Sequence, residues 1–341
     1  MSRISTPWWV ITIIIILLPL SLPVIIISNI VIGIHFSIWT QSKTKHYRYQ
    51  CHDETHNQQL QKYHEDNVKS FHHLNITNQQ FHDALIKTFT INNEKIKLHG
   101  LLLRATTPST KWMIIAHGWT ENCYQVLNIA WYWRENGYNV CTYDARGHGN
   151  STISITTIGI NEKYDLHAIV NYITNNYQPT TFGLMGHSMG AATIIEYAKH
   201  YQPTNINFMI VDGTFTTLTH QYQWMVKRKY HCFPVMGIYG MLIFAKLCYG
   251  FAPSKCQPIA NLDTISHLPL LVIHSTNDDF IIHEMGKHIY ETKIKYETQP
   301  LSQLLLLDQA QHTKTSHLHY QTLIETTLMF AHIHTNTKET R

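Results

Sequence analysis

The sequence lacks several patterns that mark common classes of protein. Its basic residues are scattered without a long Lys/Arg run, which argues against nucleic-acid binding. Its six cysteines form no C-x-x-C pair and no Cys/His ligand set, so we expect no structural zinc site. They are also too widely spread for the dense framework of a small secreted scaffold, although a bridge among Cys232, Cys248 and Cys256 stays open. No H-E-x-x-H stretch occurs, which disfavours zincin-type metal-dependent hydrolysis.

Charged residues make up only 14% of the 341 residues, whereas 44% are hydrophobic. This composition predicts a chain that folds around a core. Charge is absent altogether between Trp8 and Trp39, roughly 30 residues dominated by Ile. That length exceeds the about 20 residues that a membrane-spanning helix needs. We therefore expect residues 1–40 to form an uncleaved membrane anchor.

A cleaved signal peptide is the alternative, but its apolar region is only about 7–15 residues long and ends at a small-residue site. No clear A-x-A site follows this stretch. The orientation of the anchor has two opposing indications. Lys43, Lys45 and Arg48 favour a cytoplasmic main domain, whereas the short amino-terminal tail with one Arg is typical of an export-type anchor. We expect the main domain outside the cytoplasmic membrane, and residues 41–80 as a polar linker.

From residue 81 to 335 the sequence alternates between short apolar runs and helical patterns. An amino-terminal hairpin is expected to turn at Asn92-Asn93. Such alternation predicts an α/β fold with a mostly parallel sheet covered by helices on both faces. Residues 214–266 form a long insertion with an apolar stretch at 232–245, which we expect to be a helical cap. The expected strands are 84–91, 95–103, 112–116, 138–144, 182–185, 208–212, 270–274 and 303–308.

The pentapeptide Gly186-His187-Ser188-Met189-Gly190 has the pattern G-x-S-x-G. An apolar strand pattern precedes it and a helical pattern follows it, which is the context of a sharp strand-to-helix turn that exposes the central serine. The alternative is a helix-capping serine in a Gly-rich turn. We expect Ser188 to be a nucleophile.

A serine nucleophile needs a histidine base, and the histidine needs an orienting carboxylate. Asp278 follows the 270–274 strand and is the predicted acid, and Asp279 is the second candidate for that role. The alternative is that the two Asp residues only cap the next helix. His312 follows the last strand and is the predicted base, because His317 and His319 are expected in the next helix.

Two backbone N–H groups are expected to bind the oxyanion, those of Met189 and Trp119. His117, two residues before Trp119, is expected to be structural. The turn at 144–151 is expected to support the site, with Arg146 paired to a carboxylate. It lacks both the G-x-G-x-x-G spacing and a P-loop lysine, so it is not read as a phosphate-binding loop.

Together these stretches resemble the α/β-hydrolase superfamily over residues 81–335, and within it the bacterial membrane-anchored serine hydrolases. The resemblance implies a triad of Ser188, Asp278 and His312 and no cofactor. Ser275 stands where the acid loop of the superfamily usually has Gly, while Asp278 keeps the place of the acid. The superfamily hosts many chemistries, so the resemblance does not transfer a substrate.

We expect a serine hydrolase that cleaves a carboxylic ester or thioester through an acyl-enzyme. The apolar cap beside a membrane anchor favours a lipid-like acyl substrate, although ordinary packing explains the cap equally well. An acyltransferase or peptidase with the same residues, or a catalytically silent membrane-tethered binding module, are the alternatives. Haloalkane dehalogenase chemistry is disfavoured because the nucleophile is not Asp. The sequence makes no prediction of oligomeric state.

Overall fold

The computed structural model describes residues 83–230 and 234–336. The described chain divides into two units, and the smaller one contains Tyr222–Ala252. The predicted anchor at residues 1–40 and the linker at 41–80 lie outside the described residues and remain predictions. Among the helices that are described, none has the length and hydrophobicity to cross a membrane.

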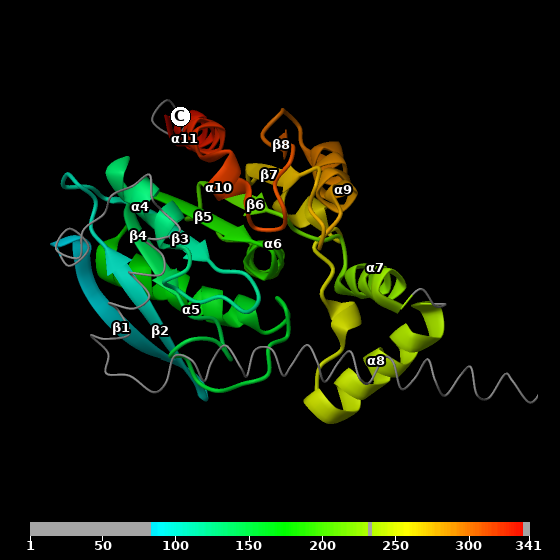
Figure 1. The fold of residues 1–341 in the computed structure, drawn as a ribbon. Helices are drawn as coiled ribbons and strands as arrows, with labels where there is room; N and C mark the ends of the chain where they lie inside the picture. The colour runs from blue at the N-terminus through cyan, green and yellow to red at the C-terminus, as the bar shows by residue number, and fades with distance from the viewer. Residues whose placement is uncertain (1–82, 231–233, 337–341) are drawn as a thin grey trace, which may run out of the picture. The chain divides into compact units, whose positions relative to one another are not determined.

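The larger unit contains an eight-stranded sheet in the order β1-β2-β4-β3-β5-β6-β7-β8 (Figure 1). β1 and β2 form an antiparallel hairpin, β2 pairs antiparallel with β4, and all other neighbours are parallel. The mostly parallel sheet predicted from the sequence is therefore confirmed. The strands are β1 (Leu85–Asn93), β2 (Ile96–Leu103), β3 (Lys111–Ala116), β4 (Asn139–Tyr143), β5 (Thr181–His187), β6 (Phe208–Asp212), β7 (Leu270–Ser275) and β8 (Gln303–Leu307).

The turn of the amino-terminal hairpin differs from the prediction. Asn92 and Asn93 remain in β1, and the chain turns at Glu94-Lys95, where Glu94 has a φ of 53°. The side chain of Asn93 donates a hydrogen bond to Asp165 at 3.0 Å, a tertiary contact that favours its place at the end of the strand. The prediction of the turn at Asn92-Asn93 was wrong by two residues.

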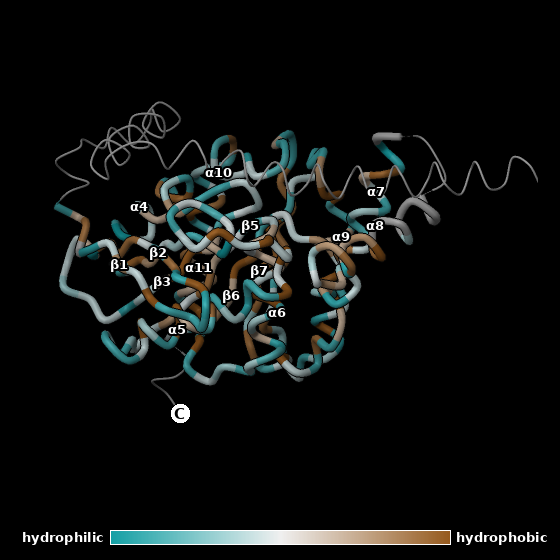
Figure 2. The backbone as a smooth tube through the Cα atoms, turned by 90° about the horizontal axis from the view of Figure 1, so that it is seen from below, coloured by the Kyte–Doolittle hydropathy of each residue, from teal (hydrophilic) through white to brown (hydrophobic). Residues whose placement is uncertain are grey.

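Alternate residues of a strand point to opposite faces of the sheet. Both faces of the central strands carry apolar side chains, and helices cover both of them. On β3, Trp112 and Ile114 join one buried cluster, which includes residues of α5 (Glu162–Tyr177), α6 (Met189–Tyr201) and α9 (His283–Lys293). Met113 and Ile115 join the other cluster, with α4 (Leu127–Glu135) and α11 (Tyr320–Asn336). The hydropathy colouring in Figure 2 shows hydrophobic backbone segments along the central strands and hydrophilic ones in the surrounding loops.

The parallel strands β3 to β8 end at one edge of the sheet, and the predicted site residues lie in the loops that follow them. Ser188 follows β5, Asp278 follows β7, and His312 lies between β8 and the short helix α10 (Thr315–Leu318). This is the edge at which open α/β sheets bind their ligands.

Two helices of the predicted cap insertion lie between β6 and β7 in the chain, α7 (Leu218–Tyr230) and α8 (Pro234–Tyr249). α8 contains most of the apolar stretch that was predicted to be a cap helix. Its side chains at Tyr239, Ile243 and Leu247 are exposed. Cys248 and Cys256 are free thiols, so they do not form the disulfide that the sequence left open. Cys232 lies outside the described residues.

Candidate active site

Ser188 occupies a strained turn between β5 and α6. Its φ is 53°, a left-handed value that is uncommon for a residue other than glycine. Its backbone N–H donates to the carbonyl of Asp212 at 2.8 Å, which fixes the turn against the end of β6. Gly190 is required two residues later, because a Cβ there would lie 2.1 Å from the carbonyl oxygen of Ala116 on β3. The chain thus forms the strand-to-helix turn that the G-x-S-x-G pattern predicts.

The structure brings the three predicted triad residues together. His312 Nε2 lies 2.9 Å from Ser188 Oγ, and His312 Nδ1 lies 2.7 Å from Asp278 Oδ2. The other carboxylate oxygen of Asp278 accepts the backbone N–H groups of Phe280 at 2.9 Å and Ile281 at 2.8 Å. The neighbouring Asp279, the reserve candidate, is exposed.

Asp278 is held as a carboxylate. Burial alone would raise its pKa, but hydrogen bonds from His274, His312 and the N–H of Ile281 hold the pKa well below its usual range. His274 is fully buried on β7, with Nε2 2.9 Å from the carbonyl of Ile281 and 3.4 Å from Asp278 Oδ2. Gly286 leaves room for this ring, since a Cβ there would lie 2.4 Å from His274 Nδ1. His274 was not predicted as a site residue.

Asp212, at the end of β6, contacts both halves of the site. Its carbonyl accepts the N–H of Ser188, and its carboxyl oxygen Oδ2 accepts the hydroxyl of Thr315, three residues after His312. Burial raises the pKa of Asp212, and the Thr315 hydrogen bond and nearby histidines only partly oppose that shift. Asp212 was not predicted as a site residue, although its place at the carboxyl end of a parallel strand is a signal for one.

A partly buried contact between Glu121 and His187 lies next to Ser188 in the chain. Burial would raise the pKa of Glu121, but His187 and the N–H of Gly118, which donates to Glu121 at 2.7 Å, bring it to about 2. Burial lowers the pKa of His187, but the Glu121 carboxylate more than offsets this and the net shift is upward. Each partner therefore shifts the pKa of the other toward its charged form, and neither residue was predicted as a site residue.

His117 has the structural surroundings that were predicted for it. Its Nδ1 donates to the carbonyl of Gly118 at 2.7 Å, and its Nε2 accepts the N–H of Ala145 at 3.0 Å. Burial lowers its pKa, so the ring is neutral. Met189 is the first residue of α6, and Trp119 lies in the loop after β3, partly buried against the core. Their N–H groups remain the predicted oxyanion donors.

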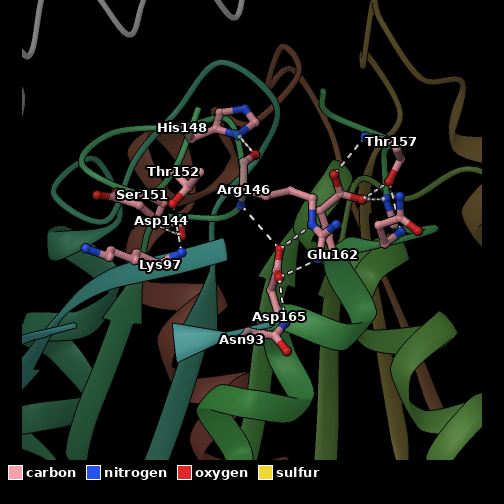
Figure 3. A network of polar contacts seen from close by, with 12 residues as sticks. Asn93, Lys97, Asp144, Arg146, His148, Ser151, Thr152, Thr157, Glu162 and Asp165 are labelled. Atoms are coloured by element: carbon pink, nitrogen blue, oxygen red, sulfur yellow. Dashed lines mark hydrogen bonds and ion pairs between the residues drawn. The ribbon is translucent and has the colours of Figure 1, made fainter. Parts of the chain in front are cut away.

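The turn at 144–151 is held by buried carboxylates (Figure 3). Arg146 pairs with Asp165 through two hydrogen bonds, Nε to Oδ2 at 2.8 Å and a terminal nitrogen to Oδ1 at 2.7 Å. Asp165 is fully buried, and so is Glu162, which accepts the N–H and hydroxyl of Thr157. Arg146 is thus paired with a carboxylate, as expected from the sequence.

One group of described residues has the chemistry of metal ligands. The ligand atoms of His99, Cys123 and Asp144 all lie within 4.8 Å of one another. The Asp144 carboxylate, however, already accepts the N–H groups of Cys123 at 2.8 Å and Asn150 at 2.9 Å. Burial also raises the pKa of the Cys123 thiol well above its usual value, which opposes the thiolate that a metal requires. The hydrogen bonds among these residues are those of a structural support for the turn at 144–151.

Comparisons with known proteins agree with this architecture. The family model for serine aminopeptidase S33 matches residues 107–247. The chain is 33% identical over 190 residues to the uncharacterized protein YqkD of Bacillus subtilis, an alignment that covers 55% of this chain and 61% of YqkD. It is 25% identical over 203 residues to an acyl transferase of Photorhabdus luminescens, covering 55% and 64% of the two chains.

Among solved structures, the esterase Pf2001 of Pyrococcus furiosus superposes with a TM-score of 0.61 at 25% identity. The superposition covers 76% of this chain and 96% of the esterase.

Proposed function

The chain belongs to the α/β-hydrolase superfamily, and we propose that it is a serine hydrolase that cleaves a carboxylic ester or thioester through an acyl-enzyme intermediate. One observation carries the proposal: Ser188, His312 and Asp278 form a continuous hydrogen-bonded series of 2.9 and 2.7 Å. A serine becomes a nucleophile when its hydroxyl lies within hydrogen-bond reach of a histidine and a carboxylate orients that histidine.

In the proposed reaction, Ser188 Oγ attacks the acyl carbon while His312 Nε2 takes the hydroxyl proton. The Asp278 carboxylate stabilises the resulting imidazolium, and the N–H groups of Met189 and Trp119 bind the oxyanion. His312 then gives the proton to the leaving alcohol or thiol as its bond to the acyl carbon breaks. A water molecule repeats the sequence on the acyl-enzyme and releases the carboxylic acid and free Ser188.

The substrate is proposed to be lipid-like, and the protein to be held at a membrane by its first 40 residues, with the hydrolase domain outside the cytoplasmic membrane. The charge-free stretch from Trp8 to Trp39 and the apolar sequence of α8 support this proposal. If short water-soluble p-nitrophenyl esters are cleaved far faster than medium-chain ones, the lipid-like substrate is wrong.

Labelling with a fluorescent fluorophosphonate tests the proposed chemistry. The full-length protein in detergent is compared with Ser188→Ala and His312→Ala, and with His288→Ala on the exposed face of α9 as a matched histidine control. We expect labelling of the wild type and the control, and none of the two site variants. A folded wild type that does not label would favour a silent binding module instead.

Acyl transfer to an alcohol is a second candidate, favoured by the likeness to the Photorhabdus luminescens acyl transferase. It uses the same acyl-enzyme and differs only in the acceptor. Product analysis in the presence of a competing alcohol separates the two. A hydrolase yields mainly the free acid, whereas a transferase yields mainly the new ester at millimolar alcohol.

A further inference from the structure

The loop between β3 and α4 closes on itself at Gly118, and Glu121 makes both of the closing contacts. The backbone N–H of Glu121 donates to the carbonyl of Gly118 at 3.3 Å. The Glu121 carboxylate accepts the N–H of Gly118 at 2.7 Å. A Cβ on Gly118 would lie 2.9 Å from that carboxylate oxygen, so the missing side chain makes room for the contact. Both polar groups of Gly118 are therefore bound by one residue of the same loop.

The carbonyl that Glu121 binds belongs to the peptide unit that carries the N–H of Trp119, one of the two predicted oxyanion donors. A peptide bond is planar and trans, so its C=O and N–H groups point in opposite directions and turn together. His117 Nδ1 donates to the same carbonyl at 2.7 Å, which gives this peptide a second fixed contact. The direction of the Trp119 N–H is thus set by the groups that hold the Gly118 carbonyl.

The Glu121 carboxylate also contacts the strand that leads to the nucleophile. It lies against Nε2 of His187, the last residue of β5, which directly precedes Ser188. Met189, whose N–H is the second predicted oxyanion donor, begins α6 directly after Ser188. The low pKa of Glu121, about 2, keeps its carboxylate oxygens available as acceptors. One side chain therefore joins the loop after β3 to the turn between β5 and α6.

An oxyanion hole stabilises developing charge because its donors are already in place before the reaction begins. One predicted donor lies in the loop after β3 and the other at the start of α6, so their separation depends on how the loop is held to the turn. We propose that Glu121 is a positioning residue for the oxyanion hole. It orients the Trp119 N–H through the Gly118 peptide, and it ties this N–H to the Ser188 turn through His187. This inference rests on the proposed ester hydrolysis.

The variants Glu121→Ala and Glu121→Gln test the positioning role in the full-length protein in detergent, with p-nitrophenyl decanoate as substrate. The kcat is expressed per molecule that reacts with a fluorophosphonate at completion, so a loss of folded protein does not enter it. Removing an oxyanion donor altogether costs about 10² to 10³ in kcat. We expect Glu121→Ala, which only releases a donor, to lower kcat by roughly 10- to 100-fold and to keep KM within about twofold.

The glutamine variant keeps an acceptor oxygen on a side chain of the same length. It should restore kcat to within about fivefold of the wild type. Glu291→Gln makes the same chemical change at an exposed position of α9 and should leave both kcat and KM unchanged.

A decyl trifluoromethyl ketone reports on the oxyanion hole itself. In the expected adduct, Ser188 Oγ adds to the ketone carbon, His312 takes the hydroxyl proton, and the carbonyl oxygen becomes the oxyanion. The Ki of this ketone should rise in Glu121→Ala by about the same factor by which kcat/KM falls, because both depend on the same donors. A merely structural role would lower the labelled fraction without linking these two quantities.

His187→Ala tests the tie between the loop and the turn. The two side chains are in contact, so their effects on kcat should not be independent. We expect the double variant Glu121→Ala/His187→Ala to lose no more than the larger of the two single losses. A double variant whose loss is the product of the two single losses would overturn the tie through His187.

The remaining outcomes separate this inference from the proposed function. A Glu121→Ala variant that keeps the wild-type kcat per labelled molecule would overturn the positioning role and leave the serine hydrolase standing. A higher KM at unchanged kcat would also overturn it, because Glu121 would then bind substrate instead of orienting a donor. A Ki for the ketone that stays constant while kcat/KM falls would overturn the role in the oxyanion hole. A folded wild type that neither labels nor cleaves the ester would overturn both proposals.

Discussion

Replacing Asp278 with Asn should disable His312 without displacing it. In the wild type, Oδ1 of Asp278 accepts two backbone N–H groups, at 2.9 Å and 2.8 Å, and Oδ2 faces His312 Nδ1 at 2.7 Å. An asparagine has one oxygen and one NH2 group. The two N–H donors of the loop require the amide oxygen at the Oδ1 position, so the NH2 group must face His312.

That orientation reverses the proton arrangement of the imidazole. An NH2 group donates, so His312 Nδ1 must accept, and the ring proton of neutral His312 then sits on Nε2. A protonated Nε2 cannot take the proton of Ser188. In serine proteases the equivalent change lowers kcat by about 10⁴, and we expect a loss of roughly 10³ to 10⁴ here. The change is nearly isosteric, so the fold should be kept.

Asp279→Asn is the matched control, because it makes the same chemical change on an exposed neighbour. Both variants are compared with wild type for the rate of fluorophosphonate labelling, for ester turnover and for Tm. We expect the control to stay within about twofold of wild type, as surface changes usually do. An Asp278→Asn variant that retains more than a tenth of the wild-type rate would refute the tautomer argument. Equal losses in both variants would refute the assignment of the acid.

Three further changes test other parts of the structure. Gly190→Ala places a Cβ 2.1 Å from a β3 carbonyl oxygen, so we expect a loss of about 3 kcal/mol or failure to fold, read by chemical denaturation. Arg146→Met leaves the buried Asp165 carboxylate without its cation and should lower the free energy of unfolding by about 3–5 kcal/mol. The double variant Arg146→Met/Asp165→Leu should regain much of that loss. A double variant whose loss equals the sum of the two single losses would contradict this. Because the pKa of Glu121 falls from 4.5 to about 2 on folding, its contribution is present above pH 4.5 and is lost as the pH falls toward 2. The stability difference between wild type and Glu121→Gln should therefore shrink over that range, and a constant difference would contradict the ion pair.

Much of the sheet is readable from the sequence because its central strands are buried on both faces. Such strands read as continuous apolar runs, as Trp112 to Ala116 does, and these runs stand out from polar loops. The hairpin turn was misplaced because Asn92-Asn93 favours a turn locally. In the structure Asn93 instead ends β1, where it pairs with Ile96 and contacts Asp165, which lies 72 residues away in the chain. Local turn preference does not contain that information.

The meeting of the three predicted site residues could be expected from the sequence for a related reason. Each candidate follows a parallel strand, and such strands end at one edge of the sheet, so the order of strands alone brings Ser188, Asp278 and His312 to the same region. The polar partners around them have no comparable signal. Glu121 and His187 are 66 residues apart, and their pairing depends on how the loop after β3 packs against the end of β5. A single Glu in a loop looks the same in the sequence whether it is paired or solvated.

Asp212 contributes to the distance between Ser188 and His312, although it is not one of the three predicted site residues. The distance between Ser188 and His312 depends on two loops that are 124 residues apart in the chain, and each loop must be held to a common reference. Asp212 provides that reference, because its carbonyl holds the N–H of Ser188 and its carboxyl group holds Thr315 in the histidine loop. Gly213, the next residue, has a φ of 61° and would bring a Cβ to within 3.4 Å of the His312 ring. The end of β6 therefore contacts both the Ser188 turn and the loop that carries His312, so the geometry of the candidate site depends on Asp212 and Gly213 as well as on the three predicted residues.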